Sequence, residues 1–313
     1  MAMRIALVGI GKIAIDQHIP AIANSADWEL AATVSRHGGV DGVENYSGIE
    51  EMLAVRPDIK CVSLCLPPVP RFDYAMAALT SGRHVMLEKP PGSTIAECQA
   101  LERMAITSGV SICATWHSRE AAQVDAAKVW LSDKKPRRIT IIWKEDVRRW
   151  HPGQTWIWAA GGLGVFDPGI NALSILTKIL PVAVHLTEAA LSFPENCDTP
   201  IAADLTFFHP DGAEVSAQFD FRQDSEQTWT IEIETDDGMM RLAEGGAGLT
   251  INGERQADPV VDANAPRGEY PRLYAKMADL VRSNSIEMDL APMIHVADAF
   301  LIGKRIIVDA FHE

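Results

Sequence analysis

The chain has 313 residues, of which 28 are basic and 42 acidic, so its formal net charge is −14. This acidic balance argues against a nucleic-acid partner, whose phosphate backbone is bound by Lys and Arg, and against an anionic membrane surface, although a locally basic pocket can still exist. With 47% hydrophobic and 22% charged residues the chain has the composition of a globular protein, long enough for one large domain or two of ordinary size.

Nothing in the sequence favours export, membrane insertion or a metal site. No stretch approaches 18 consecutive apolar residues, and Lys12 and Asp16 interrupt the apolar start of the chain without a cleavage site after it. The five cysteines are odd in number and form no C-x-x-C motif, which is typical of reduced thiols. We therefore expect a cytoplasmic protein. No metal is expected, because the nine histidines form no H-x-x-x-H motif.

The first third of the chain alternates between short apolar runs and helical patterns. Strands are expected at residues 4–9, 29–35, 61–66, 84–87 and 111–115, and helices at 18–26, 49–55, 72–81 and 94–108. Continuous apolar strands separated by helices indicate βαβ units, which build a doubly wound parallel sheet.

The rest of the chain alternates polar and apolar residues, as in an antiparallel sheet with one covered face. Strands are expected at residues 139–145, 184–193, 201–209, 214–222, 228–235, 238–242 and 249–251, and helices at 170–180, 270–283 and 292–311. The sequence thus predicts an α/β Rossmann domain over residues 1–120. It is followed by an α+β domain over residues 121–313 with an open, mainly antiparallel sheet, whose C-terminal helix could pack back on the first domain. The open sheet offers a face for a homodimer, unless the chain covers it alone.

The segment from Gly9 to Ala14 fits the pattern G-x-G-x-x-A between the first expected strand and a helix. Gly9 allows the tight turn, and Gly11 lets the backbone approach a pyrophosphate. The pyrophosphate would then lie at the helix N-terminus, beside Lys12 and Ile13. We expect a dinucleotide here, and an ordinary glycine turn is the alternative.

Cofactor selectivity is expected at the end of the second strand, which carries Ser35, Arg36 and His37 and lacks the acid that binds a ribose 2′-hydroxyl. Ser35 can hydrogen-bond, Arg36 can clamp a 2′-phosphate and His37 can assist. NADP is therefore the expected cofactor, although NAD stays usable if Arg36 stacks on the adenine. Leu66 and Pro67 follow the third strand and should approach the nicotinamide ribose, unless they form only a rigid turn.

Glu88 and Lys89 stand at the carboxyl end of the fourth expected strand, where open α/β sheets bind ligands. With the glycine turn before it and an antiparallel domain after it, the Glu-Lys-Pro-Pro motif resembles the glucose-fructose oxidoreductase/inositol dehydrogenase (Gfo/Idh/MocA-type) family. Residues 114–119, 143–154 and 161–174 are similar to the bacterial members that oxidise L-arabinose or D-galactose at C1. The resemblance implies a nicotinamide cofactor and an aldose oxidised to its lactone.

The chain departs from that family at one expected catalytic position. Many members carry Asp-x-x-x-His in the helix that starts near Asp167, and the histidine is often the proposed acid/base. The matching residue here is Asn171, whose amide cannot accept a proton. We therefore assign Lys89 and Asp167 as a coupled catalytic pair, without deciding which of them takes the proton. Asp167 could instead be the N-cap of a helix that begins at Pro168.

Several residues are expected to hold the sugar, although each could be a structural polar group. Asn171 lies four positions after Asp167 on the same helix face, and its amide suits hydroxyl groups. By resemblance Glu145 and His151 are ligands for sugar hydroxyls, and His117 follows the fifth strand at the ligand edge of the sheet.

Six of the eight tryptophans fall between positions 116 and 158. Most tryptophans are core residues, but an aromatic face also packs well against the C–H face of a sugar. Trp150 and Trp156 flank the expected sugar loop, and Trp150 is the preferred candidate.

The expected function is that of an NAD(P)-dependent aldose 1-dehydrogenase of carbohydrate catabolism, which takes a small neutral sugar. D-galactose and L-arabinose are both plausible substrates, because a pocket discriminates weakly against one extra small group. Two alternatives stay open: another sugar, polyol or diol dehydrogenase of the same family, and a non-catalytic sensor that binds NADP and a sugar.

Overall fold

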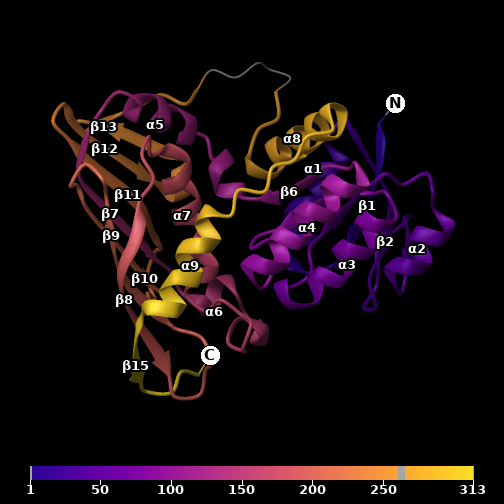
Figure 1. The fold of residues 1–313 in the computed structure, drawn as a ribbon, viewed down its shortest axis with the longest axis horizontal. Helices are drawn as coiled ribbons and strands as arrows, with labels where there is room; N and C mark the ends of the chain where they lie inside the picture. The colour runs from indigo at the N-terminus through magenta and orange to yellow at the C-terminus, as the bar shows by residue number, and fades with distance from the viewer. Residues whose placement is uncertain (1, 260–264, 313) are drawn as a thin grey trace. The chain divides into compact units, whose positions relative to one another are not determined.

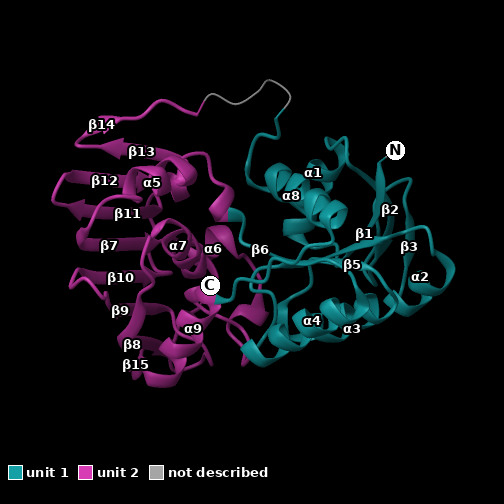
Figure 2. Ribbon diagram, turned by 45° about the horizontal axis from the view of Figure 1, so that its top comes forward, with its two compact units in different colours: residues 1–117, 263–290 teal, residues 118–262, 291–313 magenta. Residues whose placement is uncertain are grey.

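The computed structural model describes residues 2–259 and 265–312, and the chain divides into two compact units. Unit 1 comprises residues 1–117 and 263–290, and unit 2 comprises residues 118–262 and 291–313 (Figure 2). The chain therefore returns to unit 1 for one late segment before it ends in unit 2. The division expected from the sequence had placed that segment with the second domain.

Unit 1 is built on a six-stranded parallel sheet in the order β3-β2-β1-β4-β5-β6. Its strands are β1 (Met3–Val8), β2 (Trp28–Val34), β3 (Glu44–Tyr46), β4 (Cys61–Leu64), β5 (His84–Glu88) and β6 (Ile112–Thr115). Figure 1 labels β1, β2 and β6 of this sheet. The predicted parallel sheet is confirmed, and β3 adds a strand that has no buried residue for a hydrophobic pattern to reveal. The strand order reverses between β1 and β4, and ligands of such sheets bind where it reverses.

Helices cover both faces of this sheet. They are the π-helix η1 (Ala14–His18), α1 (Ile19–Ala23), α2 (Ile49–Val55), α3 (Pro68–Thr80), α4 (Ile95–Ser108) and α8 (Glu269–Ser283). The predicted start of α3 at residue 72 is wrong, because Pro68 takes the first helical turn, where the missing N–H is no loss.

The returning segment places α8 against the same sheet. In Figure 2, α8 and α1 lie on one face of the sheet and α3 and α4 on the other. Leu273 and Met277 of α8 pack into one buried cluster with Ile22 of α1 and with Ile5 and Met86 of the strands. Burial of this apolar surface holds α8 on unit 1.

Unit 2 contains a nine-stranded sheet in the order β14-β13-β12-β11-β7-β10-β9-β8-β15. Its strands are β7 (Pro136–Lys144), β8 (His185–Pro194), β9 (Ala202–Phe208), β10 (Glu214–Asp220), β11 (Thr228–Thr235), β12 (Gly238–Ala243), β13 (Gly248–Ile251), β14 (Glu254–Arg255) and β15 (Lys304–Val308). The pairs β7–β10 and β8–β15 are parallel and the others antiparallel, so the predicted, mainly antiparallel sheet is confirmed.

One face of this sheet is covered by α5, α7 and α9 (Figure 2). The helical elements of the unit are α5 (Val124–Leu131), α6 (Val147–Trp150), η3 (Thr155–Ile157), α7 (Phe166–Ile179), η4 (Glu244–Gly246) and α9 (Ala291–Ile302), and η2 (His117–Glu120) leads from the last residue of the first segment of unit 1 into unit 2. Within the described parts of both units, no helix is long and apolar enough to cross a membrane.

The predicted helix over residues 292–311 is wrong in its second half. α9 ends at Ile302, and residues 304–308 form β15 beside β8. Gly303 is a poor helix residue, and Ile306, Ile307 and Val308 are β-branched residues that fit a strand. The helix therefore ends at Ile302, although apolar residues continue beyond it into β15.

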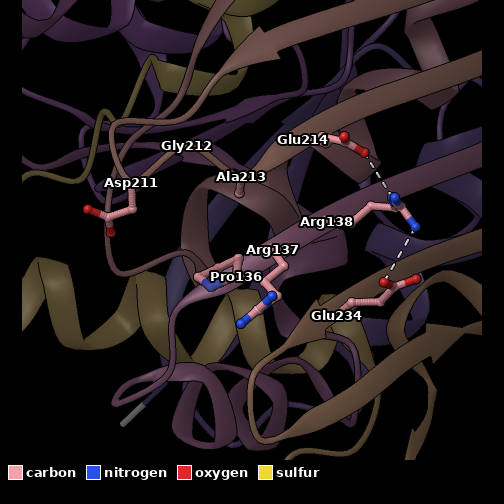
Figure 3. Close-up of a pocket in the computed structure, with 8 residues that line it drawn as sticks. All are labelled: Pro136, Arg137, Arg138, Asp211, Gly212, Ala213, Glu214 and Glu234. Atoms are coloured by element: carbon pink, nitrogen blue, oxygen red, sulfur yellow. Dashed lines mark hydrogen bonds and ion pairs between the residues drawn. The ribbon is translucent and has the colours of Figure 1, made fainter.

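The uncovered face of the sheet is polar and carries ion pairs across its strands. Arg138 on β7 lies between Glu214 on β10 and Glu234 on β11, with N–O distances of 3.0 and 3.5 Å (Figure 3). These residues border a surface hollow of about 410 Å³, whose lining includes none of the expected site residues. Exposed ion pairs of this kind add little stability.

Glycine 169 lets α7 approach β10 closely. A Cβ added to Gly169 would lie 2.6 Å from Cδ2 and 2.8 Å from Cε2 of Phe219, which is buried in the core. We expect Gly169→Ala to lower the free energy of unfolding by about 1–3 kcal/mol, because the helix must shift. Urea denaturation measures this. A matched control is Gly248→Ala, where the nearest atom would lie 3.7 Å away; equal losses in the two variants would contradict the steric account.

Candidate active site

The turn after β1 is packed against protein at Gly9 but open at Gly11. Gly9 has φ +85°, and a Cβ there would lie 2.9 Å from Cδ2 of Leu66, so the turns after β1 and β4 meet closely. A Cβ on Gly11 would meet no protein atom within 4 Å, so packing does not require glycine there. Lys12 and Ile13 follow, both exposed, in the helical turn that leads into η1. The turn therefore fits a dinucleotide pyrophosphate at a helix N-terminus.

The end of β2 is positively charged and open. The Ser35 amide donates to the Tyr46 carbonyl (3.0 Å), and Ser35 Oγ accepts from the His37 amide (3.2 Å). Arg36 and His37 are exposed, and neither forms an ion pair within the residues that the structure describes. A guanidinium in this position fits a 2′-phosphate. Pro67, also exposed, is the N-cap residue of α3.

Glu88 ends β5 and is only 4% exposed. Its Oε1 accepts hydrogen bonds from Tyr270 Oη of α8 (2.8 Å) and from His18 Nε2 of η1 (3.1 Å). Its Oε2 accepts from the backbone N–H of Lys89 (2.8 Å). His18 Nδ1 lies 2.7 Å from Tyr274 Oη, which itself donates to Ser63 Oγ (3.3 Å).

These contacts fix the charges of the cluster. Burial alone would raise the pKa of Glu88, but the hydrogen bond and charge of His18 lower it to about 2. Burial alone would lower the pKa of His18, but Cys65, Tyr274 and Glu88 outweigh it, and that pKa is raised well above its usual value. Glu88 and His18 thus form a buried pair of opposite charges, in which both imidazole nitrogens carry protons.

The backbone around Lys89 is held on its other side by Arg71 of α3. The Arg71 guanidinium is buried and donates to the backbone carbonyls of Leu66, Glu88 and Pro90. The peptide bond between Lys89 and Pro90 is cis. The half-buried Lys89 side chain therefore starts from a backbone segment with fixed hydrogen bonds on both sides.

His117 ends the part of unit 1 that precedes unit 2. Its Nδ1 lies 2.6 Å from Oε2 of Glu269, and its ring stacks on Tyr270 with centroids 5.4 Å apart. His117 thus packs on Tyr270, which donates to Glu88, and its role as a sugar ligand stays a prediction.

In unit 2, the start of α7 places Asp167. The N-cap of α7 is Val165, without a side-chain hydrogen bond, and Asp167 lies in the first turn at 3% exposure. The alternative reading of Asp167 as an N-cap is therefore wrong. Asn171, half-buried, follows four residues later on the same helix.

Glu145 and His151 meet Asp167 in one cluster. His151 Nε2 lies 3.5 Å from Oε1 of Glu145 and 3.7 Å from Oδ2 of Asp167. The Trp229 indole donates to Oε2 of Glu145 (2.8 Å), and Glu145 is buried. The structure thus brings together three of the expected site residues of unit 2.

Aromatic rings border this cluster. Trp229 lies between Trp150, with centroids 5.1 Å apart, and Trp143, at 5.9 Å. Within the described chain the indole N–H groups of Trp143 and Trp150 are buried and have no hydrogen-bond partner. A buried donor without an acceptor is costly, so these groups fit a site that is completed by a polar ligand. Trp156 is half-buried and is not among these three rings.

Sequence reasoning missed His18, Tyr270 and Trp229. Tyr270 and Trp229 lie 182 and 84 positions from the carboxylates that they bind, so no local pattern could reveal them. His18 had one available signal, since it is a titratable residue that directly follows the dinucleotide turn on its helix.

An open glycine turn on a parallel sheet, with a charged strand end beside it, is the arrangement of a dinucleotide-binding Rossmann domain. The model of the Gfo/Idh/MocA oxidoreductase family, with its NAD-binding Rossmann fold, matches residues 3–115. The chain is 39% identical to galactose 1-dehydrogenase of Pseudomonas fluorescens over 312 residues, which cover 99% of each chain. The chain therefore belongs to the Gfo/Idh/MocA oxidoreductase family, and the expected resemblance is confirmed.

Solved structures agree with this assignment. The crystal structure of D-galactose-1-dehydrogenase from Rhizobium etli matches with a TM-score of 0.94 and 52% identity, covering 99% of this chain and 98% of that one. A 3-ketoreductase from Actinomadura kijaniata, solved with TDP-benzene and NADP, matches with a TM-score of 0.83 at 16% identity over 98% of this chain and all of that one. The second match shows a shared fold alone.

The buried Glu88–His18 pair predicts a defined pH dependence. Glu88→Gln leaves His18 without its counter-charge, and we expect the free energy of unfolding at neutral pH to fall by about 3 kcal/mol. Because the folded pKa of Glu88 is depressed, its contribution is complete above the ordinary value of 4.5 and is lost as the pH falls towards about 2.

Urea denaturation of the wild type and the variant at several pH values measures this difference. The difference in the free energy of unfolding between wild type and Glu88→Gln should disappear as the pH falls from 4.5 to about 2. Glu50→Gln, which changes an exposed residue, should show no comparable difference from the wild type. A difference in the free energy of unfolding that stays constant down to a pH of about 2 would contradict the depressed pKa of Glu88.

Proposed function

We propose that the protein is an NAD(P)-dependent aldose 1-dehydrogenase, which oxidises D-galactose, and also L-arabinose, at C1 to the lactone. The observation that carries this proposal is the cluster of Glu145, His151 and Asp167 beside indole groups that lack a partner. Carboxylate, imidazole and indole groups together suit the hydroxyls and the C–H face of a sugar. Full-length similarity to two galactose dehydrogenases supports the same substrate class.

The cofactor, when bound, supplies the carbon that accepts the hydride from C1. Its proposed ligands are the turn residues Gly9, Gly11, Lys12 and Ile13, the β2 residues Ser35, Arg36 and His37, and Leu66, Pro67, Glu88 and Lys89 at the ends of β4 and β5. Arg36 would bind a 2′-phosphate, so we propose NADP as the preferred cofactor, with NAD as a second one.

Lys89 and Asp167 are the proposed proton acceptors. As the C1–H bond breaks, the C1 hydroxyl must lose its proton so that the lactone carbonyl can form. The Asp167 carboxylate lies in the first turn of α7, and its Oδ2 is 3.7 Å from Nε2 of His151, one of the proposed sugar ligands. We treat Lys89 and Asp167 as a coupled pair, in which one takes the proton and the other orients it.

The sugar would be held by Glu145, His151, Asn171 and His117, with Trp150 against its C–H face. Glu145 and Asp167 are buried carboxyl groups, which can form hydrogen bonds with the hydroxyls of a neutral sugar. D-galactose and L-arabinose differ by a hydroxymethyl group, which a pocket of this kind discriminates weakly.

Turnover with purified protein tests the proposal. The absorbance of reduced cofactor should rise with D-galactose and with L-arabinose, and Lys89→Ala and Asp167→Ala should each lower kcat by about 100-fold or more. The double variant should be no worse than the weaker single variant, because the two residues act as a unit. Lys128→Ala, on the exposed side of α5, is the control.

Near-normal turnover in either single variant would contradict the coupled pair. If the cofactor is reduced in the presence of inositol but not of any aldose, the result favours a polyol dehydrogenase. If the cofactor binds but no compound reduces it, the result favours a sensor.

Cofactor selectivity has its own test. Arg36→Ala should raise the KM for NADP by about tenfold and leave the KM for NAD nearly unchanged, because only NADP carries the 2′-phosphate. Steady-state kinetics with both cofactors measure this. Arg103→Ala removes an exposed positive charge from α4 in the same unit and should change neither value. An unchanged KM for NADP in Arg36→Ala would overturn the assignment.

A further inference from the structure

The carboxylate of Glu88 binds the backbone of the next residue. Glu88 Oε2 accepts the N–H of Lys89 (2.8 Å), while Oε1 accepts from Tyr270 and His18. The carboxylate therefore joins the proposed catalytic lysine to two side chains from other parts of unit 1. It cannot rotate without breaking at least one of these bonds.

Both donors are themselves fixed. His18 is fully buried at the end of η1, and its other ring nitrogen lies 2.7 Å from Tyr274 Oη. Tyr270 and Tyr274 are both on α8, so one helix supports Glu88 directly and through His18. Burial and the Glu88 charge raise the pKa of Tyr270 well above its usual value, so its hydroxyl stays protonated and donates.

The cost of this arrangement points to a role beyond packing. A buried charge pair gives little net stability, and an apolar replacement of similar volume is often as stable. The backbone at Lys89 has to be placed well, since a lysine side chain is long and a displacement of about 1 Å at a reacting group can cost about 100-fold in rate. Three hydrogen bonds on one carboxylate supply such placement.

We infer that His18 and Tyr270 are positioning residues, which hold Lys89 in its working position through the Glu88 carboxylate. This inference rests on the proposed role of Lys89. It also gives a function to the return of the chain to unit 1, since α8 brings Tyr270 to a strand end that lies 182 positions earlier in the sequence.

The test uses conservative variants of the full chain. Tyr270→Phe removes one hydroxyl, His18→Ala removes the second donor, and His18→Gln keeps an N–H donor in place of the imidazole. The matched control is Ser111→Ala, which breaks a different bond between α8 and the sheet, from Ser111 Oγ to the Leu280 carbonyl (2.9 Å). Two readouts are taken: hydrogen exchange of the Lys89 amide without ligands, by mass spectrometry, and kcat and KM for D-galactose.

The Lys89 amide should exchange roughly tenfold faster in Tyr270→Phe and His18→Ala than in the wild type, because its acceptor is released. In the same two variants kcat should fall roughly tenfold while KM stays within about twofold. In His18→Gln both the exchange rate of the Lys89 amide and kcat should lie closer to the wild-type values than in His18→Ala. Ser111→Ala should match the wild type in both readouts.

The inference is overturned if Tyr270→Phe exchanges and turns over as Ser111→Ala does, or if kcat falls while exchange at Lys89 is unchanged. A wild type that oxidises no sugar would refute the proposed function, and the exchange experiment would then decide the placement of Lys89 by itself. If His18→Ala does not fold, Tyr270→Phe, which loses a single oxygen atom, decides.

Discussion

The burial of one carboxylate, that of Glu88, constrains much of unit 1. A charged carboxylate without water must be paired and hydrogen-bonded, and here His18, Tyr270 and the Lys89 amide meet that demand. The helix after the dinucleotide turn, the end of β5 and the late helix α8 are thereby tied to one group. These hydrogen bonds replace the water that the buried carboxylate has lost. One of them also fixes the backbone of the proposed catalytic lysine, Lys89.

Unit 2 meets a similar demand by different means. Glu145 is buried against the Trp229 indole, and His151 lies between Glu145 and Asp167. Asp167 stands in the first turn of α7, which Gly169 allows to pack directly on Phe219 of β10. Close packing of a helix on a sheet thus determines the position of Asp167. Near it, the buried indole N–H groups of Trp143 and Trp150 have no hydrogen-bond partner among the described residues, which supports the proposed binding of a polar ligand there.

Local patterns in the sequence were enough for the main architecture. The apolar runs of β1, β2, β4, β5 and β6, the glycine turn and most of the alternating strands of unit 2 were predicted correctly, because burial on two faces or one leaves a direct periodicity. β3 and β15 escaped this reasoning, since β3 has no buried residue and β15 follows an apolar helix with only Gly303 between them. Tyr270 and Trp229 escaped it as well, because their roles depend on contacts between distant segments, which no spacing in the sequence records.

The central claim is that a hydride leaves C1 of the sugar, and isotope transfer tests it most directly. The protein is incubated with NADP and with D-galactose that carries deuterium at C1, and the mass of the reduced cofactor is measured by mass spectrometry. The account predicts that the reduced cofactor gains one deuterium and that the sugar product, the lactone, retains none at C1. Reduced cofactor without deuterium, or no reduced cofactor at all, would contradict it.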